Sequence, residues 1–499
     1  MVRTATLRAG TEWRPTAGRV RATLGRHRLF CAVTVLAIVP RVFAMIGFQP
    51  ALLFRLDTFD YLWGAVRVAP NPINPSGYSL FLWLLRPFHS LALIAGLQHV
   101  MGLAIAAMVY LVLYRRGVAA WLATLAAVPV LFEPGQLVLE HLIMSDLLAF
   151  FLMMASLTLL LLRRMPTAAR SAAAGALMGA AALVRPTVLL LIILLPLYLL
   201  AVRGGWRRAG AALLAGVIPV AGYGLWFATV YGQFGLTNSD GLFLWSRTMS
   251  FAHCSVIRPP AHLRPLCPEA QPGGLGRLPV AKRPVPRTYL WQHDAWMWRD
   301  SPPAFAPDAS AFTPANNQRA RDFAVRAIKA QPLGYLGVVA RGTYGSFTSH
   351  YLLRFPRQST VLGISGRFYS YALGSVVAYT GTGQGLAHYL GWQYATRAHQ
   401  PFAYLLREYQ AVFHLPGVVV AVILLLGLAG IIIPRRRTAA AVLMWLSAVI
   451  TIVLPVAVHE YDPRYLSPAI PLGCMAAALA FRDRRRDSLR APVTVEPVT

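Results

Sequence analysis

Two carboxylates, Asp57 and Asp60, follow directly after a hydrophobic segment of residues 29–54. Ionisable groups at a membrane boundary are expensive to bury and usually serve a function. If residues 57–68 form a helix, the spacing of three places both carboxylates on one face. Asp57 followed by Thr58 also suits a simple helix N-terminus. The apolar face, which we expect to rest on the lipid interface, carries Phe59, Leu62, Trp63 and Val66.

Further polar groups follow on the same short stretch. Arg67 supplies a cation, Tyr61 and Tyr78 supply hydroxyl groups on aromatic rings, and a proline-rich turn of residues 70–75 lies between Arg67 and Tyr78. Acid, base and hydroxyl groups on one loop favour a chemical site over a helix cap alone. The two aspartates are therefore the candidate catalytic residues.

A second polar motif, LEHLIMSD, contains Glu140, His141 and Asp146. These side chains could hold a divalent cation, hydrogen-bond to sugar hydroxyl groups or cap a helix. A glutamate and an aspartate six residues apart do not share a helix face unless a break intervenes. A metal site stays an open alternative, and the sequence indicates no other cofactor.

Two arginine motifs lie between apolar segments. Arg185 could snorkel to the membrane surface or bind a phosphate group. The turn of residues 459–465 contains Glu460, Asp462 and Arg464. An ion pair that merely closes this turn is the simpler alternative to a role in binding.

The composition excludes a soluble domain, because 57% hydrophobic and 13% charged residues in a chain of 499 are typical of a polytopic membrane protein. The net charge of +29 does not indicate nucleic-acid binding. The arginines fall in short clusters beside apolar segments, where they act as topology signals.

We predict an all-α fold of ten transmembrane helices, with interfacial helices in the first external loop and a large external loop region. Each apolar segment is near the roughly 20 residues that a bilayer requires. The predicted spans are residues 29–54, 91–114, 118–132, 147–162, 171–183, 187–202, 209–230, 412–433, 438–458 and 465–481.

The arginine clusters indicate cytoplasmic termini. With the N-terminus inside and retained, each cluster between or after the spans falls on the cytoplasmic side, as the positive-inside rule requires. Most acidic residues then fall on the opposite side. We therefore expect a multi-pass protein of the bacterial plasma membrane whose active site is on the external face. The clusters are residues 115–116, 163–164, 207–208, 435–437 and 482–486.

This topology divides the chain into five parts. They are a basic cytoplasmic tail (1–28), a transmembrane catalytic module (29–230) with its first external loop at 55–90, an external region (231–411), C-terminal transmembrane helices (412–482) and a second cytoplasmic tail (483–499). Residues 259–314 are rich in proline, which predicts an irregular loop. The pattern of residues 320–409 predicts amphipathic helices that lie on the membrane surface. Cys254 and Cys267 share this oxidising compartment, so we expect them to form a disulfide.

The motifs together resemble the GT-C class of polyprenyl-phosphate-dependent glycosyltransferases, which includes protein O-mannosyltransferases and lipid A aminoarabinose transferases. Asp57 and Tyr61 match the acid-x-x-x-Tyr pattern of that class in the first external loop, and residues 75–82 are similar to the stretch that opens its second interfacial helix. Residues 140–146 resemble the second acidic motif, and residues 184–186 resemble the basic motif. The likeness covers about residues 29–230, and beyond them it is one of architecture.

The resemblance implies transfer of a hexose or pentose, as by a mannosyltransferase or arabinosyltransferase, from a polyprenyl phosphate to a glycan, lipid or protein. A carboxylate deprotonates the acceptor hydroxyl while cations hold the departing phosphate. Asp57 is the expected base, and Arg67, Arg185 and Arg464 are the candidate phosphate ligands. The expected substrate-binding residues are Tyr61, Tyr78, Glu140, His141, Asp146, Glu460 and Asp462.

The main alternative is a transporter or flippase that moves a lipid-linked sugar without changing it. Transporters hold their charged sites near the bilayer midplane and often have repeated halves. In this chain the acids gather at one predicted surface, and we see no internal repeat. An external scaffold or polymerase subunit is a third alternative.

Overall fold

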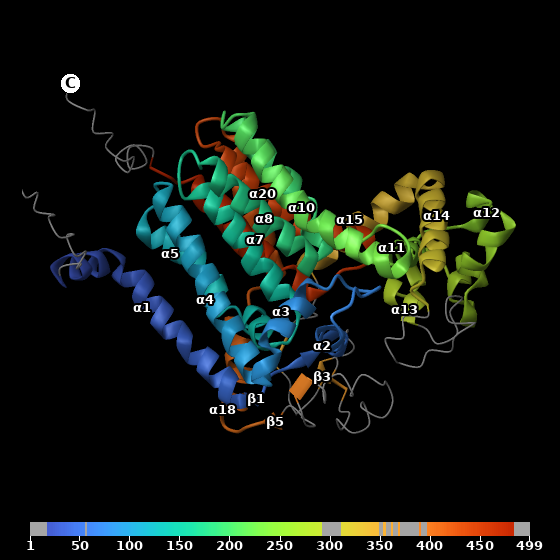
Figure 1. Cartoon of the computed structure of the whole chain (residues 1–499), viewed down its shortest axis with the longest axis horizontal. Helices are drawn as coiled ribbons and strands as arrows, with labels where there is room; N and C mark the ends of the chain where they lie inside the picture. Colours follow the sequence, from blue (N-terminus) through green and yellow to red (C-terminus); the bar gives the residue numbers. More distant parts are fainter. Residues whose placement is uncertain are drawn as a thin grey trace, which may run out of the picture.

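The computed structural model describes residues 17–54, 57–291, 311–348 and 397–483, with short pieces at 353–355, 361–362, 368–369 and 389–390. These parts of the chain are mainly helical (Figure 1). The predicted C-terminal tail, apart from Asp483, and most of the predicted N-terminal tail lie outside the described residues.

Every apolar segment predicted to cross the membrane contains a helix. In the described part of the chain, four helices, α1, α4, α10 and α20, are long and apolar enough to span, and the number is six if the bent pairs α5–α6 and α18–α19 each count as one. The helices are α1 (Ala17–Gly47), α4 (Leu91–Arg115), α5 (Ala120–Phe132), α6 (Pro134–His141), α7 (Ser145–Leu161), α8 (Ala168–Val184), α9 (Leu191–Ala201), α10 (Trp206–Tyr231), α18 (Phe402–Phe413), α19 (Gly417–Ile432), α20 (Ala439–Val458) and α21 (Ala469–Leu479).

The structure is that of a multi-pass membrane protein, but ten full-length spans are not confirmed. Helices α9 and α21 have only 11 residues each. At 1.5 Å per residue such a helix is about 16 Å long, roughly half the thickness of the hydrocarbon core. Helices α7 and α8, with 17 residues each, are also short for a span. Apolar composition alone therefore overestimates the number of complete crossings.

The first predicted span ends earlier than expected, at Gly47. Proline at position 50 has no N–H group with which to continue a helix. The chain instead forms two short strands. Strand β1 (Phe48–Gln49) pairs antiparallel with β5 (Arg397–Ala398), and β2 (Leu53–Phe54) pairs parallel with β3 (Val361–Leu362). Strand β3 in turn pairs antiparallel with β4 (Phe368–Tyr369).

Two short helices, α2 (Asp57–Arg67) and α3 (Gly77–Leu85), follow β2 in the chain and lie at one end of the bundle (Figure 1). The prediction that the apolar face of α2 rests on lipid is wrong. Phe59 and Leu62 are only 2% and 0% exposed and belong to the same buried cluster as Tyr78 of α3. Burial within the protein fixes α2 more firmly than a lipid surface would.

Residues 232–291 and 311–348 form a separate helical unit at one side of the bundle (Figure 1). Its own hydrophobic core contains Trp245, Phe323 and Tyr289. Residues 261–282, within the predicted proline-rich stretch, form a run of short 3-10 helices, as expected for an irregular segment; residues 292–310 of that stretch lie outside the described residues. The elements are α11 (Asp240–Thr248), α12 (Cys254–Ile257), η3 (Ala261–Leu266), η4 (Pro268–Ala270), η5 (Pro272–Arg277), η6 (Val280–Lys282), α13 (Pro286–Trp291), α14 (Pro314–Ala330) and α15 (Pro332–Thr348).

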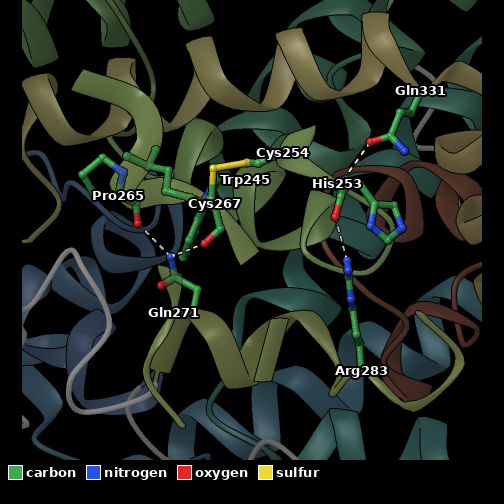
Figure 2. Close-up of a disulfide and its surroundings, with 10 residues drawn as sticks. Trp245, His253, Cys254, Pro265, Cys267, Gln271, Arg283 and Gln331 are labelled. Carbon is green, nitrogen blue, oxygen red and sulfur yellow. Dashed lines mark hydrogen bonds between the residues drawn. A yellow bond between two sulfur atoms is a disulfide. The ribbon is translucent and has the colours of Figure 1, made fainter. Parts of the chain in front are cut away.

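Cys254 and Cys267 form a disulfide, the pairing that the sequence predicts (Figure 2). Trp245 Nε1 donates a hydrogen bond to Leu266 O at 2.9 Å, and Gln271 Nε2 donates to Cys267 O at 3.0 Å. The first bond ties the proline-rich segment to α11, and the second closes a turn within that segment.

Candidate functional site

Five charged side chains, from segments far apart in the chain, meet beside α2. Arg185 Nη1 lies 2.6 Å from Asp146 Oδ2. Arg464 Nη1 lies 3.4 Å from Asp57 Oδ2 and 3.9 Å from Asp146 Oδ2, and its Nε lies 3.6 Å from Asp462 Oδ1. We refer to these five residues as the acid–arginine cluster.

Each member of the cluster stands at the end of a helix. Asp57 begins α2, Asp146 lies in the first turn of α7, and Arg185 follows the last residue of α8. Asp462 and Arg464 lie in the turn after α20, where Asp462 accepts a hydrogen bond from Arg464 N at 3.1 Å. Helix ends face the same end of the bundle, so residues from four segments converge there.

The first turn of α2 is fixed to the segment that leads into α7. Thr58 Oγ1 accepts a hydrogen bond from Phe54 N at 2.7 Å and donates one to Ile143 O at 2.8 Å. The hydroxyl groups of Tyr61 and Ser145 are 2.9 Å apart. These bonds set the separation between the carboxylates of α2 and α7.

Aromatic rings hold the two guanidinium groups in place. The guanidinium carbon of Arg464 lies 4.7 Å from the ring centre of Phe54 and 5.3 Å from that of Tyr465. Arg185 lies 5.1 Å from the same tyrosine ring. Cation–π contacts of this kind stabilise a desolvated cation without using its N–H donors. Those donors remain directed at carboxylates or available to a ligand.

Asp57 is the most accessible acid of the cluster. Its side chain is 28% exposed, against 7% for Asp146 and 11% for Asp462. Partial burial nevertheless raises the pKa of Asp57 above its ordinary value, and Arg464 and Arg185 oppose that effect. An accessible carboxylate with a raised pKa is a better proton acceptor than an ordinary surface aspartate.

Asp60 has a different environment. Asn71 Nδ2 donates to Asp60 Oδ1 at 2.6 Å, and Asn74 Nδ2 donates to Asp60 Oδ2 at 3.1 Å. The residue is 5% exposed, and burial raises its pKa to about 6 in spite of these two bonds. Asp60 thus binds the turn between α2 and α3, while Asp57 faces the arginines.

Two other residues of the predicted loop lie outside the cluster. Arg67 is exposed, and its guanidinium carbon lies 4.2 Å from the ring centre of Trp63. Tyr78 is fully buried and donates a hydrogen bond to Gln98 Oε1 at 2.8 Å, with its ring 5.0 Å from that of Tyr61. The structure therefore brings two of the three predicted phosphate-binding arginines together. The ring of Tyr78 packs against that of Tyr61 in an edge-to-face contact.

The structure separates the three residues of the second polar motif. Glu140 and His141 are both 0% exposed and end α6, whereas Asp146 lies beyond a break at the start of α7. The carboxylate of Glu140 binds Arg41 of α1 at 2.8 Å and His99 of α4 at 2.9 Å. Glu140 and Asp146 therefore contact different arginines, Arg41 and Arg185, in the structure.

Other contacts show what the two buried residues do. His141 Nε2 lies 2.7 Å from Phe48 O, and its Nδ1 lies 3.1 Å from His99 Nε2. Among the described residues, the one group of side chains close enough to share a metal ion is Cys254, Cys267 and Glu269. The two cysteines of that group are joined as a disulfide. The buried network therefore links α1, α4 and α6.

Glu460, the next predicted substrate ligand, contacts the helical unit beside the bundle. Arg287 Nε lies 3.0 Å from Glu460 Oε1, and Arg287 N donates to Glu460 Oε2 at 3.3 Å. Burial raises the pKa of Glu460 to about 7, and Arg287 opposes the rise. The ion pair docks the start of α13 onto the turn that carries Arg464.

Sequence reasoning gave no role to Ser145, Asn71 or Asn74, which orient Tyr61 and Asp60. It also left Phe54 and Tyr465 without a role. A signal was available for two of them, because Ser145 is adjacent to Asp146 and Tyr465 is adjacent to Arg464.

No protein-family model and no curated protein matches the sequence. Among solved structures, the chain is similar to the Archaeoglobus fulgidus oligosaccharyltransferase in its apo form, with 14% identity and a TM-score of 0.42 over 90% of this chain and 50% of that one. It is also similar to ArnT from Cupriavidus metallidurans bound to undecaprenyl phosphate, with 15% identity and a TM-score of 0.34 over 92% and 77%.

The chain spans about half the length of the oligosaccharyltransferase.

Proposed function

We propose that this protein is a membrane glycosyltransferase that moves a sugar from a polyprenyl phosphate to an acceptor hydroxyl group on the external face. One observation carries the proposal: Asp57, the acid in register with Tyr61, lies 3.4 Å from the largely buried Arg464, and Asp146 contacts both Arg464 and Arg185. A sugar phosphate needs this combination, a proton acceptor for one reactant and cations for the leaving group of the other.

Arg464 and Arg185 are suited to the phosphate. Both guanidinium groups are largely buried, with exposures of 10% and 15%, and both are backed by aromatic rings. Arg464 Nη1 makes long contacts with its acids, 3.4 Å to Asp57 Oδ2 and 3.9 Å to Asp146 Oδ2. A donor phosphate would bind this guanidinium group more closely, since a guanidinium group binds phosphate with two parallel bonds.

In the proposed step, the acceptor hydroxyl oxygen attacks the anomeric carbon of the donor while Asp57 accepts the hydroxyl proton. The bond between the anomeric carbon and the phosphate oxygen breaks, and the electron pair leaves with the phosphate. Arg464 and Arg185 stabilise the negative charge that develops there. Asp146 and Asp462 hold the two arginines in position when no donor is bound.

The choice of Asp57 over Asp60 follows from their surroundings. Both oxygens of Asp60 are engaged by asparagine side chains, and the group is almost fully buried. Asp57 has one long contact to Arg464 and keeps 28% of its side-chain surface exposed. A donor phosphate that binds Arg464 would release Asp57 to act on the acceptor.

The test is a transfer assay with purified protein in a lipid bilayer. Polyprenyl phosphates that carry a radiolabelled hexose or pentose are supplied with extracts of candidate glycan, lipid and protein acceptors. The proposal predicts that label moves to an acceptor and free polyprenyl phosphate appears. Donor movement across the bilayer with the sugar bond intact would support the transporter alternative and contradict the proposal.

A further inference from the structure

A hollow in the molecular surface lies far from the acid–arginine cluster. It measures about 430 Å³ and lies between the turn after α19 and the end of α21. Helix α20, which has 20 residues, runs from this turn to the segment that holds Arg464. At 1.5 Å per residue the two sites are about 30 Å apart. The hollow is lined by Arg435, Arg436, Ala480, Phe481 and Arg482.

Helix packing fixes the walls of this hollow. A side chain at Gly430 of α19 would meet Ala480 Cβ at 2.5 Å, so the two helices approach closely at this level. Trp445 of α20 donates a hydrogen bond to Leu424 O of α19 at 2.9 Å. The arginines on either side of the hollow are therefore held near one another by three packed helices.

Three of the residues that line the hollow are arginines, and Asp483, which follows Arg482, is the nearest acid along the chain. The guanidinium carbon of Arg436 lies 5.1 Å from the ring centre of Phe481. This contact holds one cation over an aromatic surface and leaves its N–H donors directed elsewhere.

Exposed apolar side chains flank the hollow in sequence. Phe481, which lines it, is 57% exposed, and Ile432, the last residue of α19, is 67% exposed. Further along α19, Leu425 and Leu426 are 62% and 51% exposed, and Val418 is 58% exposed. A cationic hollow joined to an exposed apolar helix face matches an amphiphile that has an anionic head and hydrocarbon chains.

From this arrangement we infer that the hollow binds the phosphate headgroup of an anionic phospholipid, whose acyl chains lie against α19. The arginine pattern predicts that this end of α20 faces the cytoplasm, where a lipid of the inner leaflet can reach it. The site is distinct from the proposed donor site, because a bilayer-spanning helix separates them. A bound lipid would brace α19 and α21 and so stabilise the end of the bundle opposite the reaction.

The experiment is native mass spectrometry of the full chain in detergent, titrated with phosphatidylglycerol and with phosphatidylcholine of the same acyl chains. The pocket variant carries Arg435→Gln, Arg436→Gln and Arg482→Gln. A matched control carries Arg163→Gln, Arg164→Gln and Arg170→Gln, which removes the same charge from another arginine cluster on the same predicted side.

The inference predicts that wild-type protein binds phosphatidylglycerol at least about tenfold more tightly than phosphatidylcholine. The pocket variant should lose at least about tenfold of that affinity, since three arginines at about 1 kcal/mol each near an anionic surface set an upper bound of roughly 100-fold, and the control should stay within about twofold. Equal binding of the two lipids, or an equal loss in both variants, would overturn it. Displacement of the lipid by millimolar inorganic phosphate would also overturn it, because the site would then recognise free phosphate.

Discussion

Arg464 Nη1 lies 3.4 Å from Asp57 Oδ2, although 407 positions separate the two residues in the chain. The same guanidinium group also lies within reach of Asp146 and Asp462. One arginine near the C-terminus thus neutralises acids from three different segments. An anionic phosphate that competes for Arg464 would loosen its contact with Asp57, which couples donor binding to the appearance of a free base.

Replacing either cluster arginine should weaken donor binding. A charge-assisted hydrogen bond contributes about 1.5–3 kcal/mol, so Arg464→Gln and Arg185→Gln should each raise the Kd of the polyprenyl-phosphate sugar by roughly 10- to 100-fold. Arg67→Gln is the matched control, because Arg67 is exposed and contacts only the nearby Trp63 ring among the contacts described. It should change the Kd by less than about twofold. Isothermal titration in nanodiscs measures all three.

An equal loss in all three variants would indicate that general positive charge, and not the cluster, holds the donor. If Arg464→Gln bound the donor as tightly as wild type, Arg464 would not be a ligand of the donor phosphate.

Transfer should lose activity in acid at a pH higher than an ordinary aspartate would give. Burial raises the pKa of Asp57 above 3.8. A general base must be deprotonated, so the rate should rise with pH through this raised pKa. Asp60 also has a raised pKa, of about 6, and Asp60→Asn separates the two. The acid limb of kcat should persist in that variant. If the limb disappears there, Asp60 is the titrating group that controls the rate.

The buried network around Glu140 should be sensitive to a single methyl group. A side chain at Gly102 of α4 would meet Glu140 Oε1 at 1.9 Å, whereas one at Gly96 of the same helix meets only Met45 Cε at 3.8 Å. Gly102→Ala should lower the free energy of unfolding in detergent by roughly 1–3 kcal/mol. Gly96→Ala should have no such cost. Equal stabilities of the two variants would show that Glu140 does not occupy the space beside Gly102.

The burial of Glu460 should make the free energy of unfolding depend on pH. Burial raises the pKa of Glu460 from 4.5 to about 7 in the folded protein. The folded state therefore holds this proton more tightly than the unfolded state, and the associated stability is present below about pH 4.5 and is lost as the pH rises through about 7.

Glu460→Gln cannot titrate, so the loss of stability between pH 5 and pH 8 should be smaller in the variant than in wild type. The expected difference is about 2 kcal/mol, from the pKa shift with allowance for residual solvation. Chemical unfolding in detergent at both pH values measures it. A wild-type protein that becomes more stable over this range, relative to the variant, would mean that Arg287 dominates and the pKa of Glu460 is lowered.

The apolar helices and the disulfide could be predicted from the sequence because their signals are local. Each apolar run contains a helix, and Cys254 pairs with Cys267. The number of complete crossings could not be predicted, because the lengths of α9 and α21 depend on where the chain turns within an apolar run. The strands after Gly47 likewise depend on partners such as Arg397–Ala398, about 350 positions further along.

Charged residues of the site were recognised individually, since their position beside apolar segments is visible in the sequence. Their grouping was not visible. Asp146 and Glu140 belong to different networks because of the break between α6 and α7. The distinction between Asp57 and Asp60 depends on the side chains of Asn71 and Asn74, which fold back from the following turn. Spacing on one helix face cannot reveal such contacts.

The most direct test of the central claim is the transfer rate of Asp57→Asn beside that of Asp60→Asn. Asparagine keeps the size of the side chain but cannot accept the acceptor proton. The account predicts that Asp57→Asn loses roughly two orders of magnitude or more in kcat, binds the donor at least as tightly as wild type, and unfolds at a similar temperature. Asp60→Asn should keep most of its activity. Near-normal transfer by Asp57→Asn would contradict the assignment of Asp57 as the base, and near-normal transfer by both variants would contradict the proposed reaction.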